Sequence, residues 1–167
     1  MHSPFPESLV LGKFMPLHLG HEYLIETARN ASIHLTVIVC SLSREPIPGD
    51  LRASWVAHRF RDDMDSGRIR LFHLAEDWMP QHPSDAASPQ AFFGAWAGVL
   101  RALAGVDVDA LFTSEEYGDS LAKYLGAVHV KVDPARERFP VSGTAVRGNP
   151  KAHLHYLNAE VARYFAR

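Results

Sequence analysis

Short apolar runs alternate with segments of helical periodicity along most of the chain. Residues 34–41, HLTVIVCS, are β-branched and almost continuously apolar, which is typical of a strand buried on both faces of a sheet. Residues 20–31 instead carry apolar side chains at helical spacing. These two patterns predict strands at 8–12, 34–41, 69–75, 109–114 and 127–133, and helices at 20–31, 50–64, 91–104, a short stretch ending at 125, 143–148 and 151–166.

Helices of this length between strands imply βαβ units, and hence an α/β fold with a parallel sheet and helices on both faces. Asp50 is expected to cap the helix at 50–64. Residues 76–90 contain three prolines and are expected to form a loop. At 167 residues, with no internal repeat, the chain is expected to form one domain, 1–167. Ligands of such sheets bind beyond the carboxyl ends of the strands, where the polar segments of this chain also fall.

The composition of the chain limits the kinds of partner and the cellular setting that we expect for it. The formal net charge of −2 gives no global reason to expect nucleic acid or an anionic membrane, so any bound anion must be held by a local site. The single cysteine, Cys40, cannot form an internal disulfide and lies in an apolar run. It is expected to be a buried structural thiol in a reducing, cytoplasmic setting. No apolar stretch approaches the length of a membrane span, and the N-terminus lacks a signal-peptide pattern.

Residues 12–21, GKFMPLHLGH, form the junction between the first predicted strand and the first predicted helix. Gly12 allows a sharp turn after the strand, and Pro16 stiffens the connection. Gly20 and His21 begin the helix, where unpaired backbone N–H groups and the positive end of the helix dipole form an anion site. Gly20 also permits close approach of a phosphate to the backbone.

Three side chains add to this anion site. The imidazoles of His18 and His21 can donate hydrogen bonds, and Lys13 supplies a mobile positive charge. The combination suits a polyphosphate and the charge that grows during phosphoryl or nucleotidyl transfer. Zinc is disfavoured, because no third ligand stands at metal spacing and Cys40 is alone, so no resident metal site is predicted. Neither a Walker loop nor a G-x-G-x-x-G dinucleotide motif is present.

The junction resembles the signature of the H-x-G-H nucleotidyltransferases, which share a Rossmann-like sheet. Residues 139–150, FPVSGTAVRGNP, are similar to the family's second signature, a Ser-x-Thr-x-x-Arg segment that opens a late helix. TSEE at 113–116 and VDPAR at 132–136 look like one branch, the bacterial nicotinamide mononucleotide (NMN) adenylyltransferase domain of multifunctional NAD-biosynthesis regulators. In those proteins a ribosylnicotinamide kinase domain follows. The resemblance covers about 9–165 and implies a stand-alone transferase, or a fragment of a larger protein, without that kinase domain.

The resemblance implies transfer of AMP from ATP to NMN, giving NAD and pyrophosphate, with the NMN phosphate attacking the α-phosphorus in line. It implies that His21 donates to the α-phosphate in the transition state and that His18 contacts the phosphates or holds the turn. Lys13 would contact the β- or γ-phosphate, and Arg147 the leaving pyrophosphate. Mg²⁺ is the implied cofactor, carried largely by the nucleotide phosphates.

Further ATP contacts are implied for Gly12, Phe14, Pro16, Gly20, Ser114, Glu115, Ser142, Gly143 and Thr144. Ser142 and Thr144 can cap the helix that starts near Gly143 and offer hydroxyl groups to the triphosphate. Gly143 stands where serine is common elsewhere in the superfamily, but a glycine also suits the NMN-specific branch.

NMN contacts are assigned to Arg44, Arg52, Trp78, Trp96, Asp133 and Arg136. The arginines at 44 and 52 could instead form surface ion pairs with Glu45 or Asp50. Either tryptophan could stack on the nicotinamide ring, and core packing is the alternative for Trp96. His58, His73 and His129 fall within helix or strand patterns and are interpreted as structural.

Other functions stay open at this stage. Pantetheine-phosphate adenylyltransferase uses the same attack on ATP, although it gives no reason for TSEE or for the tryptophan-bearing loop. A cytidylyltransferase is disfavoured because Phe139 to Ser142 replace its usual downstream motif. A non-catalytic NAD or ATP sensor on the same fold is the alternative of another class, and the two intact histidines argue against it. The preference for amide or acid in the pyridine nucleotide and a possible homo-oligomer are left open.

Overall fold

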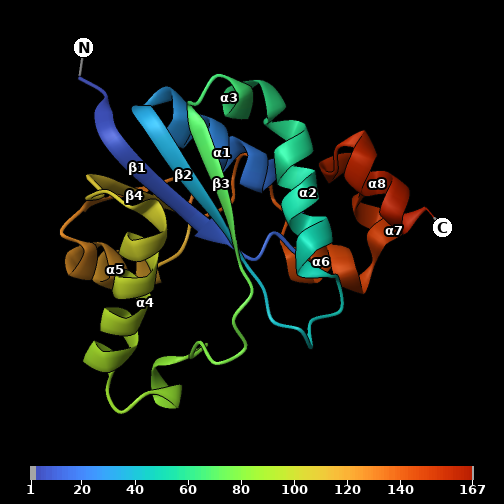
Figure 1. Ribbon diagram of the computed structural model, residues 1–167. Coiled ribbons are helices and arrows are strands. Elements are labelled where there is room, and N and C mark those ends of the chain that lie inside the picture. The colour runs from blue at the N-terminus through green and yellow to red at the C-terminus, as the bar shows by residue number, and fades with distance from the viewer. Residues whose placement is uncertain (1–2, 167) are drawn as a thin grey trace.

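The computed structural model describes residues 3–166 as one parallel five-stranded sheet with helices on both faces (Figure 1). The strand order is β3-β2-β1-β4-β5. The α/β class predicted from the alternating pattern is therefore confirmed. The strands are β1 (Phe5–Gly12), β2 (Ser32–Cys40), β3 (Ile69–Leu74), β4 (Ala110–Thr113) and β5 (Val128–Lys131). The helices are α1 (Leu19–Asn30), α2 (Gly49–Arg59), α3 (Arg61–Asp65), α4 (Pro89–Ala104), α5 (Tyr117–Leu125), α6 (Gly143–Gly148), α7 (Pro150–His153) and α8 (Ala159–Phe165), with 3₁₀ turns at Pro83–Asp85 and Leu154–Tyr156.

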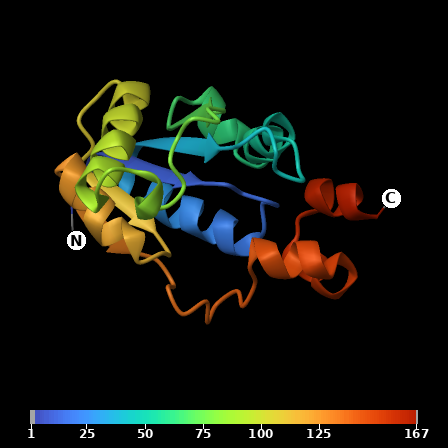
Figure 2. The ribbon, with the colours of Figure 1, turned by 90° about the horizontal axis from the view of Figure 1, so that it is seen from below.

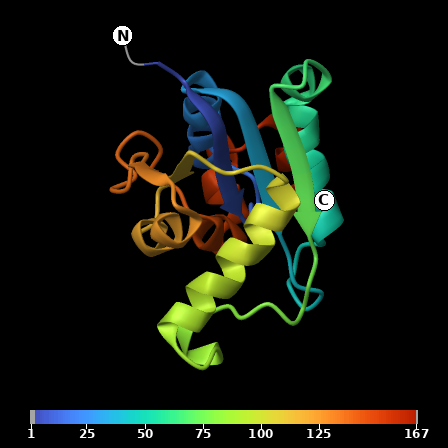
Figure 3. The ribbon, with the colours of Figure 1, turned by 60° about the vertical axis from the view of Figure 1, so that its left-hand side comes forward.

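The sheet has a hydrophobic core on each face, because successive side chains of a buried strand point to opposite sides. Val10 of β1 packs with α1 and α2 in one core, whereas its neighbour Leu9 packs with α4 and α5 in the other. Figure 3 shows α4 crossing in front of the strands, with α1 and α2 behind them. No helix formed by residues 3–166 has the length and hydropathy needed to span a membrane.

The strand order places the junction after β1 at the centre of the molecule. The chain moves outward from β1 to β2 and β3, and then returns to add β4 and β5 on the other side of β1. The connections after β1 and β4, which are neighbours, therefore leave on opposite faces of the sheet. Such a switch point opens a crevice beyond the carboxyl ends of the two strands.

Three sequence predictions are corrected in detail. The helix expected at 50–64 is interrupted at Phe60, which is buried with a non-helical backbone, so α2 and α3 are separate. Asp50 does not cap α2, which begins one residue earlier after Pro48 without a side-chain cap. Its carboxylate lies in the first turn, at the positive end of the helix dipole. The helix expected at 151–166 consists of α7, a 3₁₀ turn and α8, and Asn158 caps α8 through a 3.0 Å bond from the Val161 N–H.

Candidate active site

A cavity of about 640 Å³ lies at the switch point, beyond the carboxyl ends of β1 and β4. It is bounded by the junction after β1, by α4, by the segments that follow β4 and β5, and by the start of α6. Most of the site residues predicted from the sequence line it: Gly12, Lys13, Phe14, His18, Gly20, His21, Trp96, Ser114, Glu115, Asp133, Arg136, Ser142, Gly143, Thr144 and Arg147. The structure thus brings together segments from both ends of the chain. Pro16, Arg44, Arg52 and Trp78 do not line the cavity.

The two histidines of the junction cap α1 reciprocally. His18 is the N-cap residue, and its Nδ1 accepts a 3.3 Å hydrogen bond from the His21 N–H. The Nδ1 atom of His21 accepts in turn from the His18 N–H at 3.3 Å. The rings stack with centroids 3.6 Å apart. Because each Nδ1 is an acceptor, the hydrogen of each neutral ring is assigned to Nε2. Both imidazoles therefore carry an Nε2–H donor.

Gly20 makes this arrangement possible. A Cβ atom at this position would lie 3.0 Å from Cε1 and 3.1 Å from Nδ1 of His18. These distances are too short for an unstrained contact, so a side chain at position 20 would push the His18 ring away from the His21 N–H. The glycine of the H-x-G-H pattern thus has a steric role in the cap, besides leaving the backbone accessible to a ligand.

Both rings are held neutral. Burial, reinforced by the positive charge of Arg136, lowers the pKa of His18 to about 4. Burial, His18 and Arg136 together hold the pKa of His21 well below its ordinary value. A neutral imidazole can polarise an oxygen through its N–H without transferring a proton. The pair is therefore suited to donate hydrogen bonds at neutral pH.

The second predicted motif contacts the first directly. The Arg147 guanidinium donates through Nη1 to the Met15 carbonyl, although 132 positions separate the two residues. A Cβ atom at Gly143 would lie 2.7 Å from the same carbonyl oxygen, so only glycine allows α6 to approach this closely. This explains the glycine that replaces the more common serine. Figure 2 shows the segment after β5 running past α1 and bringing α6 beside the junction.

Ser142 caps the start of α6, as the sequence predicts, whereas Thr144 does not. Ser142 accepts a 3.1 Å hydrogen bond from the Ala145 N–H. Thr144 lies inside the helix, where its hydroxyl accepts from Arg147 Nη2 at 3.4 Å. Among residues 3–166, Arg147 has no carboxylate partner, so its positive charge is not neutralised within the described structure.

The segment after β5 holds a second arginine at the cavity. Arg136 donates to the Val141 carbonyl at 2.8 Å and to Glu115 at 3.2 Å, which joins the ends of β4 and β5. The Asp133 carboxylate accepts the N–H groups of Glu137 and Arg138 at 2.9 and 3.1 Å. Asp133 lines the cavity, but its carboxylate closes this turn.

Arg52 has a different role from the one predicted. Its side chain is fully buried, and its guanidinium donates to the main-chain carbonyls of Ile47, Lys13 and Cys40 and to the Glu45 carboxylate. No face of the guanidinium is left for a ligand, which corrects the prediction of an NMN contact. Arg44 is exposed outside the cavity, near the charge of Asp77.

The two tryptophans differ in their position relative to the cavity. Trp96 of α4 is half-buried and lines the cavity, with its Nε1–H donated to the Pro80 carbonyl at 2.8 Å. Trp78 is 65% exposed, outside the cavity, and donates to Glu76 at 2.9 Å. Phe92 and Phe93 of α4 also line the cavity, so Trp96 belongs to an aromatic wall.

Some cavity residues were not anticipated from the sequence. Tyr117 directly follows the TSEE segment. Its position just after the end of a strand is the one sequence feature that could have identified it as a cavity residue. Desolvation of its hydroxyl raises the pKa of that group, as do nearby Cys40 and Glu115, while the residue as a whole is 40% exposed. Gln81 and His82 come from the proline-containing loop, which has no periodicity to identify them. Cys40 also reaches the cavity, where burial raises the pKa of its thiol to about 12 and keeps it protonated.

The histidines interpreted as structural lie outside the cavity lining. His73 Nε2 is 2.7 Å from Ser41 Oγ, and His129 is 2.7 Å from both Thr113 Oγ1 and Asp119 Oδ1. The side chain of His58 is 54% exposed on α2. Within residues 3–166, no group of three or more His, Cys, Asp or Glu side chains could hold a metal ion.

Comparisons with known proteins identify relatives and solved structures that share the fold of this chain. No protein-family model matches the chain. The chain is 30% identical over 176 aligned residues to the trifunctional NAD biosynthesis/regulator protein NadR of Escherichia coli strain K12, covering 95% of this chain and 40% of that protein. It thus spans about two-fifths of the length of the curated relatives it matches.

Two crystal structures share the fold. One is a NadR protein in complex with NAD and AMP-PNP, with a TM-score of 0.69 and 21% identity over 93% of this chain and 45% of that one. The other is a bifunctional NMN adenylyltransferase/ADP ribose pyrophosphatase from Francisella tularensis, complexed with AMP and a Mn ion. It has a TM-score of 0.57 and 18% identity over 77% of this chain and 37% of that one. The chain is thus homologous to the NadR proteins over nearly its whole length, and its parallel sheet with surrounding helices matches the nucleotidyltransferase α/β fold of the solved structures.

Proposed function

We propose that this chain is an NMN adenylyltransferase, which transfers AMP from ATP to NMN and releases pyrophosphate. The observation that carries the proposal is the contact of Arg147 and Gly143 with the Met15 carbonyl, which joins the two motifs at one cavity. A triphosphate bound there would meet helix N–H groups and neutral imidazoles from one motif, and from the other a guanidinium that has no carboxylate partner among the described residues. The names of the NadR relatives and of the Francisella tularensis structure support NAD-biosynthesis chemistry.

In this proposal the protein positions the reactants and stabilises charge. The NMN phosphate oxygen forms a bond to the α-phosphorus as the bond to the β-phosphate oxygen breaks, and pyrophosphate leaves with that electron pair. The Nε2–H groups of His18 and His21 donate to the α-phosphate region, where charge develops. Lys13 contacts the β- or γ-phosphate, and Arg147 stabilises the leaving group. No covalent enzyme intermediate is needed.

The divalent cation belongs to the substrate in this scheme. Mg²⁺ would enter bound to the ATP phosphates, since the described residues offer no ligand cluster of their own. The Mn ion with AMP in the Francisella tularensis structure is consistent with a divalent ion at this step. The protein then contributes only the orientation of the phosphates around the ion.

The aromatic side of the cavity suits a flat heterocyclic ring, including a cationic one such as a pyridinium. Trp96, Phe92 and Phe93 supply aromatic surface there, and aromatic side chains stack on planar heterocycles. NMN carries such a ring, whereas phosphopantetheine and glycerol phosphate do not. This wall is the specific observation that ranks a pyridine nucleotide above the other acceptors.

A panel of acceptors tests the proposal. Purified protein with MgATP is incubated with NMN, nicotinate mononucleotide, phosphopantetheine or glycerol phosphate, and both pyrophosphate release and the dinucleotide product are measured. We expect NAD from NMN. Turnover with phosphopantetheine alone would assign the chain to another branch, and ATP binding without turnover on any acceptor would favour a sensor.

A further inference from the structure

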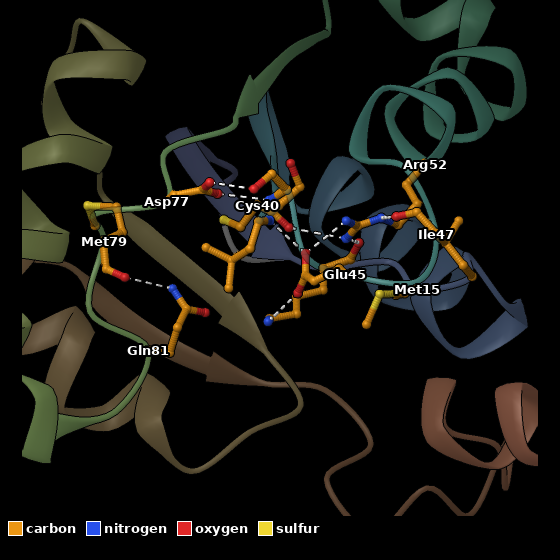
Figure 4. A network of polar contacts seen from close by, with 12 residues as sticks. Met15, Cys40, Glu45, Ile47, Arg52, Asp77, Met79 and Gln81 are labelled. Carbon is orange, nitrogen blue, oxygen red and sulfur yellow. Dashed lines mark hydrogen bonds and ion pairs between the residues drawn. The ribbon is translucent and has the colours of Figure 1, made fainter.

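Glu45 connects two cations at the edge of the cavity. It lies in the loop between β2 and α2, and its side chain is 7% exposed. Its Oε1 atom accepts from the Leu42 N–H at 2.7 Å and from Arg52 Nη2 at 2.9 Å. Its Oε2 atom accepts from Lys13 Nζ at 2.5 Å. Figure 4 shows Glu45 facing the buried guanidinium of Arg52.

Arg52 also holds the main chain of Lys13. Its Nη1 donates to the Lys13 carbonyl at 2.8 Å and to the Cys40 carbonyl at 3.3 Å, while Nε donates to the Ile47 carbonyl at 3.0 Å. One buried guanidinium therefore ties the ends of β1 and β2 together and anchors the carboxylate that binds the Lys13 ammonium. Lys13 is held at both its backbone and its side-chain end.

The Lys13 side chain needs such a restraint. It is 46% exposed and flexible, so without a partner its ammonium could turn into solvent. An ammonium has three N–H donors. With one directed to Glu45, two remain for phosphate oxygens.

The charge balance of the three residues favours an anion. Glu45 contributes one negative charge, shared between Lys13 and Arg52, so the cluster keeps a net charge of about +1 at neutral pH. Burial alone would raise the pKa of the Glu45 carboxyl. Hydrogen bonds from Lys13, the Leu42 N–H and Arg52 hold that pKa below its ordinary value, so the carboxylate stays ionised.

We propose that Glu45 and Arg52 are positioning residues that fix the Lys13 ammonium at the cavity edge, where it contacts the β- and γ-phosphates of a nucleoside triphosphate. This inference rests on the proposed function. Neither side chain touches the reacting atoms. Their effect passes through Lys13 and is specific for the phosphates that ATP has and AMP lacks.

A double-mutant cycle with two nucleotides tests the inference. Glu45→Gln keeps the size of the side chain and removes its charge. Removing this charge raises the net charge of the cluster to about +2, which by itself favours ATP, but we expect the loss of the Lys13 position to outweigh this gain. ATP affinity should therefore fall by up to about tenfold, the order expected when a charge-assisted hydrogen bond is lost, while AMP affinity changes less than about twofold. In a Lys13→Ala background, Glu45→Gln should change the ATP-to-AMP affinity ratio by less than about twofold. Affinities are measured by calorimetry, together with kcat and KM for ATP.

Asp77→Asn is the matched control for loop stability. Asp77 accepts from the N–H and the hydroxyl of Ser43 at 2.8 and 2.5 Å, so it holds the same loop without touching Lys13. It should leave the ATP-to-AMP ratio unchanged. If Glu45→Gln does not fold, Glu45→Asp keeps the negative charge but shortens the side chain, so its carboxylate cannot hold both Lys13 and Arg52 as the glutamate does, and a selective loss of ATP affinity of a few-fold is expected.

An unchanged ratio in these Glu45 variants, or an equal effect in the Lys13→Ala background, would overturn the positioning role. If the wild-type protein itself shows no preference for ATP over AMP and no turnover, the proposed function fails instead. The two failures are therefore distinguishable.

Discussion

The two ends of the cavity that we assign to the phosphates and to the acceptor, called here the phosphate end and the acceptor end, are built in different ways. At the phosphate end, His18 and His21 satisfy each other's backbone N–H groups, and Arg147 and Gly143 close against the Met15 carbonyl. At the acceptor end, Trp96 lies on α4 and is held to the proline-containing loop by one hydrogen bond to the Pro80 carbonyl. The first region is fixed by interlocking contacts over a short distance. The second depends on a loop that is joined to the rest of the molecule by Asp77, by the Pro80 carbonyl and by the buried Met79, none of which lines the cavity, so substitutions on this side should change acceptor binding more than the chemical step.

The largest effect should come from the phosphate end. His21→Ala removes an Nε2–H donor from the region where charge develops, so we expect kcat to fall on the order of 10²–10³-fold while the protein remains folded. Steady-state kinetics and circular dichroism measure the two quantities. His58→Ala, at an exposed position on α2, is the control and should leave kcat and the circular dichroism spectrum unchanged. Nearly unchanged kcat in His21→Ala would remove this residue from the mechanism.

Acid should lower the free energy of unfolding through a residue of the same region, His18. An unfolded histidine takes up a proton near pH 6.5, whereas burial lowers the pKa of folded His18 to about 4. The unfolded state therefore binds more protons between these values, and the free energy of unfolding falls as the pH drops from about 6.5 to about 4. The contribution of His18 is at most about 3 kcal/mol.

Urea unfolding across this range, compared between wild type and His18→Asn, isolates that contribution. Asparagine is a good N-cap but does not titrate, so the variant should lose less stability in acid. Parallel curves for the two proteins would show that His18 titrates alike in the folded and unfolded states.

Gly143→Ala should push the start of α6 away from the junction after β1. The added Cβ would meet the Met15 carbonyl at 2.7 Å, so α6 or the junction must shift. Displacing Arg147 by about 1 Å is expected to lower kcat/KM for ATP roughly 10- to 100-fold. Gly148→Ala is a matched control in the same helix, because its Cβ would meet nothing within 4 Å. Equal kinetics in both variants would contradict a role for this close contact.

The smallest effect is expected at the acceptor end. Trp96→Ala should raise KM for NMN about tenfold, as for loss of one stacking partner, with KM for ATP changed less than about twofold. Trp78→Ala, at a position 65% exposed and outside the cavity, should change neither value. A rise in both KM values together with a lower melting temperature would assign Trp96 to the core instead.

The parts of the site that are built from local patterns could be predicted from the sequence, whereas those that depend on the path of a loop could not. Strand and helix periodicity was enough for the parallel α/β sheet, and the resemblance of 12–21 and 139–150 to two family signatures was what predicted that Lys13 and Arg147 meet at one cavity. These patterns are local, because a capped helix after a strand turn is determined by neighbouring residues. Gln81 lies in a segment without periodicity, and only the three-dimensional path of that loop brings it to the cavity.

Arg52 was misassigned for a related reason. An arginine in a polar segment after a strand suggests a surface or ligand contact, since arginine is rarely fully buried. Its burial depends on carbonyls from Lys13, Cys40 and Ile47 converging on one point. No sequence pattern describes that convergence.

The reciprocal cap of α1 makes the two imidazoles a single working unit. Each ring uses Nδ1 to hold its neighbour's main chain, so in the proposed mechanism Nε2 is the nitrogen that remains for a ligand. Losing either ring would therefore disorient the survivor as well. A variant with only one of the two histidines would therefore lose the hydrogen-bond donor of the missing ring and the fixed orientation of the remaining one.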